Sequence, residues 1–92
     1  MRFLLRQKRA MIGHTITIKV TAGTTEEIKR VAISLDGRKI DSEILSPPEV
    51  QFERVFNQVG GGGPGRNHVL TVRATNTEGD TKVASLRWND VS

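Results

Sequence analysis

The sequence predicts an all-β fold, an antiparallel β-sandwich of about seven strands with Greek-key connections. Apolar and polar residues alternate in several segments, which is the pattern of strands with one buried face. Turn signals rich in Gly, Pro and Asn separate these segments at short intervals. No stretch has a convincing helical spacing of apolar residues.

The composition limits the size and chemistry of this fold. The chain has 92 residues, enough for one domain with a thin core, and no cysteine, which excludes disulfides, thiolate metal sites and thiol catalysis. Its formal net charge of +4 arises from Arg2, Arg6, Lys8 and Arg9, because basic and acidic residues balance in the rest of the chain. We therefore expect no nucleic-acid partner, since such domains hold a basic patch on the folded surface.

Residues 1–12 are predicted to be a basic N-terminal tail or a replacement first strand, and residues 13–90 the folded domain. A disordered tail is the favoured interpretation, and a basic arm on an anionic surface is the alternative. The apolar run Phe3-Leu4-Leu5 is too short for a signal peptide, and no run approaches the ~20 residues that span a bilayer.

The first half of the domain shows three predicted strands. Residues 14–22 alternate strictly, with Ile and Val on one face and Thr and Lys on the other. Residues 29–35 form the next strand, and Asp36-Gly37 then indicates a type I′ hairpin turn, because glycine accepts a positive φ. A short strand at 38–40 returns, and Pro47-Pro48 interrupts pairing at a sheet edge or a crossing between sheets.

The second half supplies the remaining strands. In residues 50–56 Arg54 shares the phase of Phe52 and Phe56, so we expect a bulge at 53–55. The loop at 60–65 precedes a hairpin at 68–88, whose turn is 76–80. The predicted core comprises Ile16, Ile18, Val20, Val31, Ile33, Leu35, Phe52, Phe56, Leu70, Val72, Leu86 and Trp88.

Three segments resemble elements of bacterial immunoglobulin-like (Ig-like or fibronectin-III-like) β-sandwich modules. They are the strand, Asp-Gly turn and return at 31–40, the Pro-x-x-x-Phe strand at 48–52, and the His-x-Leu-x-Val-x-Ala element at 68–79, where Asn76 replaces the common Asp. The resemblance covers about residues 14–88. It implies a spacer, stalk, adhesive or accessory module of exported or surface proteins, including multidomain polysaccharide-degrading enzymes, without a catalytic residue.

The candidate site residues each have a structural interpretation that we favour. The glycine-rich loop at 60–65 lacks the Lys-Ser/Thr pair of a phosphate-binding loop. His14 and His68 each begin a strand, and two histidines without a third ligand make a poor zinc site. Trp88 has the phase of the core, which favours burial over stacking on a sugar.

The acidic residues and the polar faces are equally unspecific. Asn76-x-Glu78-x-Asp80 has a faint calcium-like spacing, and no pair of carboxylates stands out for glycoside hydrolysis. The other acidic candidates are Asp36, Asp41 and Glu43. Two predicted strands have a threonine-rich face, which we attribute to the preference of threonine for strands. The alternative interpretation is that these faces bind a carbohydrate or a protein partner. These faces comprise Thr15, Thr17, Lys19 and Thr21, and Thr71, Arg73 and Thr75.

The sequence thus predicts a non-enzymatic structural or protein-interaction module of a larger exported bacterial protein, with no catalytic, cofactor-binding or metal residue and no cofactor. Its partner would be another protein or a neighbouring domain, meeting its loops or an unpaired edge strand. The alternative is a carbohydrate-binding accessory module with a polysaccharide partner. The expected location is extracellular, periplasmic or at the cell surface, and the cytoplasm stays open because no signal peptide is visible.

Overall fold

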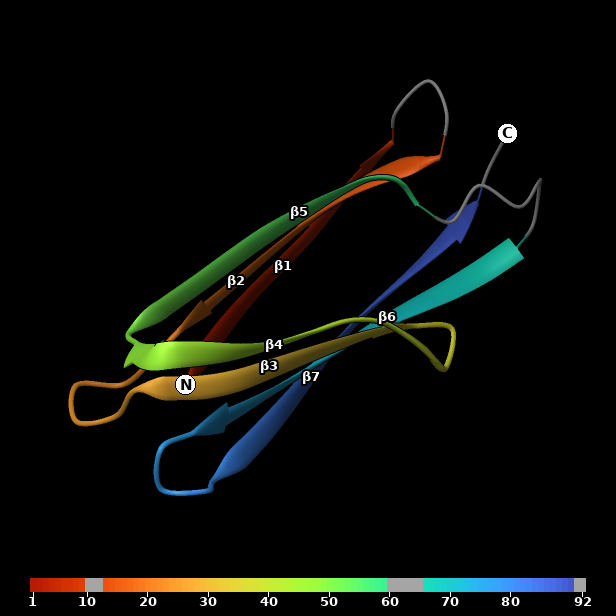
Figure 1. Ribbon diagram of the computed structural model, residues 1–92. Coiled ribbons are helices and arrows are strands. Elements are labelled where there is room, and N and C mark those ends of the chain that lie inside the picture. Colours follow the sequence, from red (N-terminus) through yellow and green to blue (C-terminus); the bar gives the residue numbers. More distant parts are fainter. Residues whose placement is uncertain (10–12, 60–65, 91–92) are drawn as a thin grey trace.

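The computed structural model describes residues 1–9, 13–59 and 66–90, which form seven strands in two antiparallel sheets (Figure 1). The strands are β1 (Arg2–Arg9), β2 (His14–Thr21), β3 (Ile28–Leu35), β4 (Arg38–Glu49), β5 (Gln51–Val59), β6 (Arg66–Asn76) and β7 (Thr81–Asp90). The predicted all-β class and the seven strands are confirmed. Among the described residues no helix is long and apolar enough to cross a membrane.

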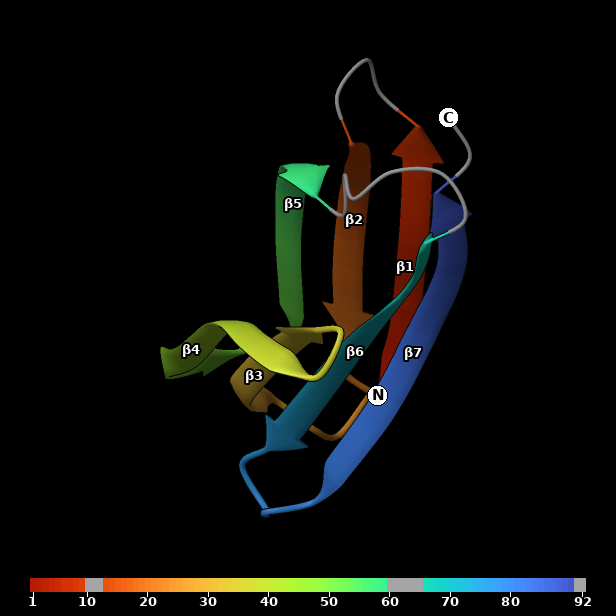
Figure 2. The same cartoon turned by 90° about the vertical axis from the view of Figure 1, so that its right-hand side faces the viewer.

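The two sheets lie face to face as the layers of a sandwich (Figure 2). One sheet has the order β1-β2-β5 and the other the order β4-β3-β6-β7. Strands β3 and β6 pair although β5, between them in sequence, belongs to the opposite sheet, which is a Greek-key feature. Strand β4 pairs with β3, unlike the constant-type immunoglobulin order, in which the fourth strand lies beside the fifth.

The core lies between the sheets and follows the period-two pattern of the sequence. All twelve predicted core residues belong to it or pack against it; Leu35, Phe56 and Leu86 are the partly buried ones. Sequence reasoning missed Ile28, which is fully buried at the start of β3. Branched aliphatic side chains dominate this core, because they suit a pleated surface that is buried on one face.

Residues 2–9 form strand β1, so a disordered tail was the wrong interpretation for them. β1 pairs with β2 from Arg2 opposite Thr21 to Arg9 opposite His14. Phe3 and Leu5 alternate toward the core and are partly buried against it, and this burial fixes the strand. Residues 10–12 lie outside the described residues, and the predicted boundary between residues 12 and 13 stays a prediction.

The predicted bulge at 53–55 was also wrong. β2 and β5 pair without a break from Thr21 opposite Gln51 to Ile16 opposite Phe56, and the irregularity falls between His14 and Ile16. Arg54 therefore keeps the inward phase between two phenylalanines. A charged side chain is tolerated there because carboxylates of β4 meet it at the open edge of the sandwich.

The turn and proline predictions hold, but β4 is much longer than expected. Asp36 and Gly37 have φ values of 52° and 83°, the two positive angles of a type I′ turn. The prolines lie where the register of β3 with β4 jumps from Ile44 to Glu49. Their missing N–H groups are harmless because β4 is an edge strand of its sheet.

Replacing Val72 with Asp should abolish cooperative unfolding at 25 °C. Val72 is 0% exposed, and an unpaired carboxylate there costs several kcal/mol, comparable with the ~5 kcal/mol stability of a small domain. Urea titration followed by circular dichroism measures this. Val83→Asp is the matched control, because Val83 is 52% exposed on the neighbouring strand. A folded, cooperative Val72→Asp variant would contradict the core assignment.

Candidate functional site

One end of the sandwich holds an aromatic cluster of His14, His68 and Trp88. The Trp88 ring lies 5.7 Å from the His14 ring and 5.5 Å from the His68 ring, measured between centroids. His14 begins β2, whereas His68 is the third residue of β6 in the other sheet, and the two rings approach one another across the core through Trp88. Trp88 is 8% exposed, which confirms its expected burial and removes it as a platform for stacking on a sugar.

Asp36 joins this cluster to the β3–β4 turn. Its Oδ2 lies 2.7 Å from Nδ1 of His68, and its Oδ1 accepts a hydrogen bond of 2.8 Å from the backbone N–H of Val69. The backbone N–H of Asp36 donates to the carbonyl of Val69 at 2.9 Å. These contacts give both side chains a structural role. In the described ranges no three His, Cys, Asp or Glu residues are grouped to hold a metal ion.

At the opposite end Glu26 receives three hydrogen bonds. Its Oε1 accepts from the Met1 ammonium at 2.6 Å and from the Gly23 N–H at 2.9 Å, and its Oε2 accepts from the Asn76 side-chain amide at 2.8 Å. The bond from the Met1 ammonium, then those from Asn76 and Gly23, lower the pKa of Glu26 to about 2. The carboxylate thereby ties the start of β1, the β2–β3 loop and the β6–β7 turn together.

Asn76 organises the turn that carried the faint calcium pattern. Its Oδ1 accepts from the N–H groups of Glu78 at 3.0 Å and Asp80 at 2.9 Å, while its amide donates to Glu26. The Asn76 oxygen is thus engaged with the turn backbone, and the side chains of Glu78 and Asp80 are exposed. An ionised aspartate at this position could not donate to Glu26, so this contact needs the amide of Asn76.

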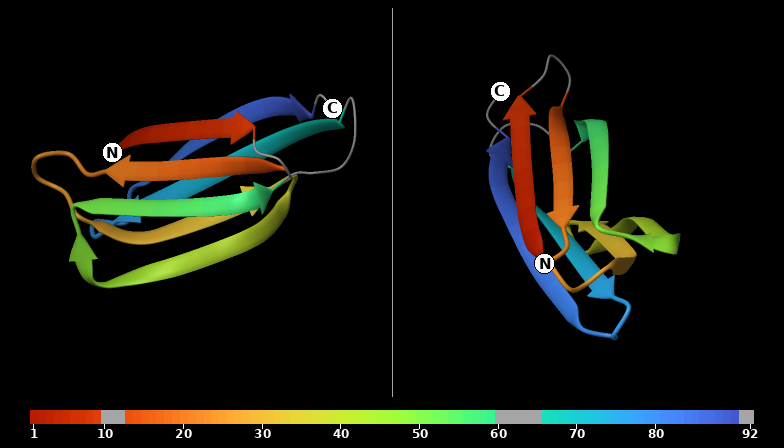
Figure 3. Two further views of the ribbon diagram at one scale, coloured as in Figure 1. Left: turned by 90° about the horizontal axis from the view of Figure 1, so that it is seen from above. Right: turned by 90° about the vertical axis from the view of Figure 1, so that its left-hand side faces the viewer.

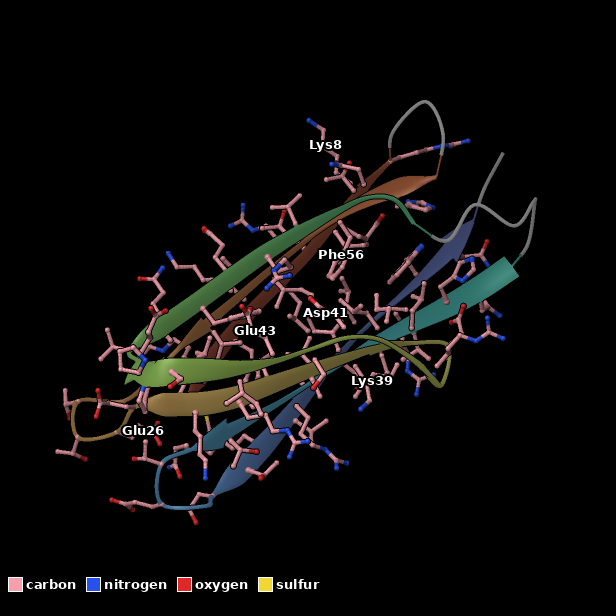
Figure 4. All side chains as sticks on the ribbon, in the orientation of Figure 1. Lys8, Glu26, Lys39, Asp41, Glu43 and Phe56 are labelled. Carbon is pink, nitrogen blue, oxygen red and sulfur yellow. The ribbon has the colours of Figure 1, made fainter. Side chains whose placement is uncertain are left out.

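Two acidic residues that looked scattered in the sequence meet at Arg54. The Arg54 guanidinium binds Asp41 Oδ2 at 2.7 Å through Nη1 and contacts Glu43 through Nη2, and it lies 5.3 Å from the centre of the Phe52 ring. Figure 4 shows Asp41 and Glu43 pointing from β4 into the space between the sheets. This ion-pair cluster connects the edge strands β4 and β5 of the two sheets, and sequence reasoning missed it.

The outer face of the four-stranded sheet is hollowed by a groove of about 580 Å³. Its lining consists of Arg30, Ala32, Ser34, Lys39, Thr71, Arg73, Thr75 and Thr81. Three cations and four hydroxyl groups line this groove without a carboxylate. The predicted polar residues of β6 belong to it. Its members on β3, β4 and β7 were not foreseen, because the sequence does not show which strands become neighbours.

The other threonine-rich face lies on the three-stranded sheet. Thr15 and Thr17 of β2 stand opposite Lys8 and Arg6 of β1, and Lys19 stands opposite Glu53 of β5. This face is therefore also basic, with a carboxylate among its cations. The loop at 60–65, considered for phosphate binding, lies outside the described residues.

The comparisons with known proteins identify the fold. No family model matches the sequence, and no curated protein matches it. The structure is similar to the fibronectin(III)-like modules of Clostridium thermocellum CbhA, with a TM-score of 0.52 and 17% sequence identity, over 96% of this chain and 97% of that chain. This likeness shows that the chain has an immunoglobulin-like, fibronectin-III-like β-sandwich fold, and it confirms the fold that the sequence motifs implied.

The contacts of Glu26 predict a specific acid sensitivity. Because folding lowers its pKa from 4.5 to about 2, the stabilisation is complete above pH 4.5 and is lost as the pH falls toward 2. A Glu26→Gln variant should be less stable than wild type at pH 6, and the difference in Tm should shrink between pH 4.5 and 2. Thermal unfolding at a series of pH values measures this.

The matched control is Glu27→Gln, which removes the same charge but none of the three hydrogen bonds of Glu26. Its curve of Tm against pH should stay close to that of wild type. A Tm difference between Glu26→Gln and wild type that is constant from pH 6 to pH 2 would contradict this role of the carboxylate.

Proposed function

We propose that this chain is a non-catalytic structural or protein-interaction module of a larger, exported bacterial protein, acting as a spacer, stalk or adhesive unit. The observation that carries the proposal is the position of its ends. β1 begins and β7 finishes at opposite ends of an elongated body that measures 44 × 20 × 18 Å (Figure 3). Modules with this geometry can follow one another head to tail in a chain, so the proposed partners are neighbouring domains.

Two further observations support a module without catalysis. Several titratable residues that the sequence singled out make structural contacts: His68 with Asp36, and Asp41 with Arg54. The fold is shared with fibronectin(III)-like modules of a bacterial protein. Together with the setting that the family resemblance implies, this supports a location outside the cell, in the periplasm or on the cell surface.

The second candidate function is a carbohydrate-binding accessory module, and the outer groove favours it. Its hydroxyl groups and cations are the polar groups that hydrogen-bond to sugars, and they stand on rigid strands. The two candidates differ in one observable. A pure spacer binds no polysaccharide, and an accessory module binds one through this face.

A distance measurement between the two ends tests the spacer function. The chain has no cysteine, so Arg2→Cys and Asn89→Cys place one fluorophore at each end. Single-molecule energy transfer should give one narrow distance distribution, centred near ~25 Å between the attachment points, because β1 and β7 rise ~3.4 Å per residue between the two ends. The control pair Arg2→Cys and Lys82→Cys lies at one end and should give a short distance. A broad distribution for the first pair would contradict a rigid spacer.

A further inference from the structure

We propose that the groove on the outer face of the four-stranded sheet binds a linear acidic polysaccharide through the carboxylates of its uronic acids. The inference rests on the carbohydrate-binding alternative and is independent of the spacer function. It assigns a ligand class to a surface whose residues the fold does not need for its core.

The charge of the groove is the first argument. Arg30, Lys39 and Arg73 are exposed, and none of them has an ion-pair partner among the residues that the structure describes. Positions 39, 41 and 43 would share one face of a regular strand, but a register shift of β4 between Lys39 and Asp41 separates them. Asp41 and Glu43 therefore point inward to Arg54, while Lys39 points outward (Figure 4). The groove therefore presents uncompensated positive charge, which an anionic ligand would neutralise.

The arrangement of the cations is the second argument. They stand on three adjacent strands, with Lys39 opposite Ser34, Ala32 opposite Arg73 and Arg30 opposite Thr75. Neighbouring strands are ~4.8 Å apart and residues rise ~3.3 Å along a strand, so the cations form a triangle that spans ~10 Å across the sheet and ~13 Å along it. An extended polymer that covers this triangle would meet all three cations. The two guanidinium groups also suit carboxylates, which they can bind with two parallel hydrogen bonds.

The floor of the groove is the third argument. Ala32 has a small side chain between its larger neighbours, which leaves space for a ligand. Ser34, Thr71, Thr75 and Thr81 supply hydroxyl groups that both donate and accept hydrogen bonds, as sugar hydroxyls require. Thr75 and Thr81 already lie 3.0 Å apart, oxygen to oxygen, so this pair is held in place across β6 and β7.

The same lining disfavours the other anionic polymers. Single-stranded nucleic acids need aromatic rings on which bases stack, and the groove has none. Protein and peptide partners bury apolar side chains at the centre of an interface, and the floor here is small and polar. A polymer of charged, hydroxyl-rich sugars matches both the cations and the hydroxyl groups.

Isothermal titration calorimetry of the full chain with polygalacturonate tests the proposal at low salt. Wild type should bind, and a rise in NaCl should weaken binding because exposed charges are screened. The double variant Arg30→Gln/Arg73→Gln should bind at least about tenfold more weakly, since it loses two charge-assisted contacts. Ala32→Leu should also weaken binding, because it fills the floor without a change of charge.

The matched control is Arg6→Gln/Lys19→Gln, which removes two cations from the outer face of the other sheet. It lowers the net charge by the same amount and should bind as wild type does. The four substituted positions of the two double variants lie on the outer faces of the sheets, away from the core. Thermal unfolding verifies that each variant is folded. Equal losses in the two double variants would overturn the groove as the site.

Three further outcomes would overturn the proposal, and they are distinguishable. Binding of a neutral galactan that is insensitive to the arginines would leave the carbohydrate-binding alternative and remove the acidic ligand. Tighter binding of single-stranded DNA through the same arginines would identify a nucleic-acid surface. No binding of any polysaccharide would remove both the inference and the alternative, while the end-to-end distance would still decide the spacer function.

Discussion

The packing of the inward side chains of β2 against those of β3 and β6 holds the two sheets together. Ile16, Ile18 and Val20 from one sheet and Ile33 and Leu70 from the other are at most 1% exposed. Each such side chain contributes about 1.5–3 kcal/mol by burial, so this strip supplies most of the stabilisation available to a domain of this size. Side chains on the outer faces of the two sheets therefore do not contribute to the packing of the core.

Polar contacts then close the sandwich where the apolar strip ends. Glu26 joins loops and strand ends on one side, and Asp36 with His68 fixes the turn on the other. Arg54 connects the edges of the two sheets. The carboxylates in these contacts are paired within the sandwich. The cations of the groove therefore stay without an acidic partner on the outer surface, which makes the groove basic.

The features that depend on local sequence could be predicted. Alternation defined the inward faces, Asp36-Gly37 defined the turn, and the phase of Trp88 defined its burial. The features that depend on contacts between distant segments could not. The pairing of β1 needs β2 as its partner, and the inward position of Arg54 is intelligible only once Asp41 lies beside it. The groove also depends on contacts between distant segments, since residues from four strands line it.

The division between a stabilising inner face and a free outer face is tested most directly by an alanine scan along β6. Urea unfolding of Leu70→Ala and Thr71→Ala, and of the next pair, Val72→Ala and Arg73→Ala, gives the free energy of unfolding at each position. We expect losses of about 2 kcal/mol or more at positions 70 and 72, and changes within about 0.5 kcal/mol at 71 and 73. Losses at 71 and 73 as large as those at 70 and 72 would contradict the account.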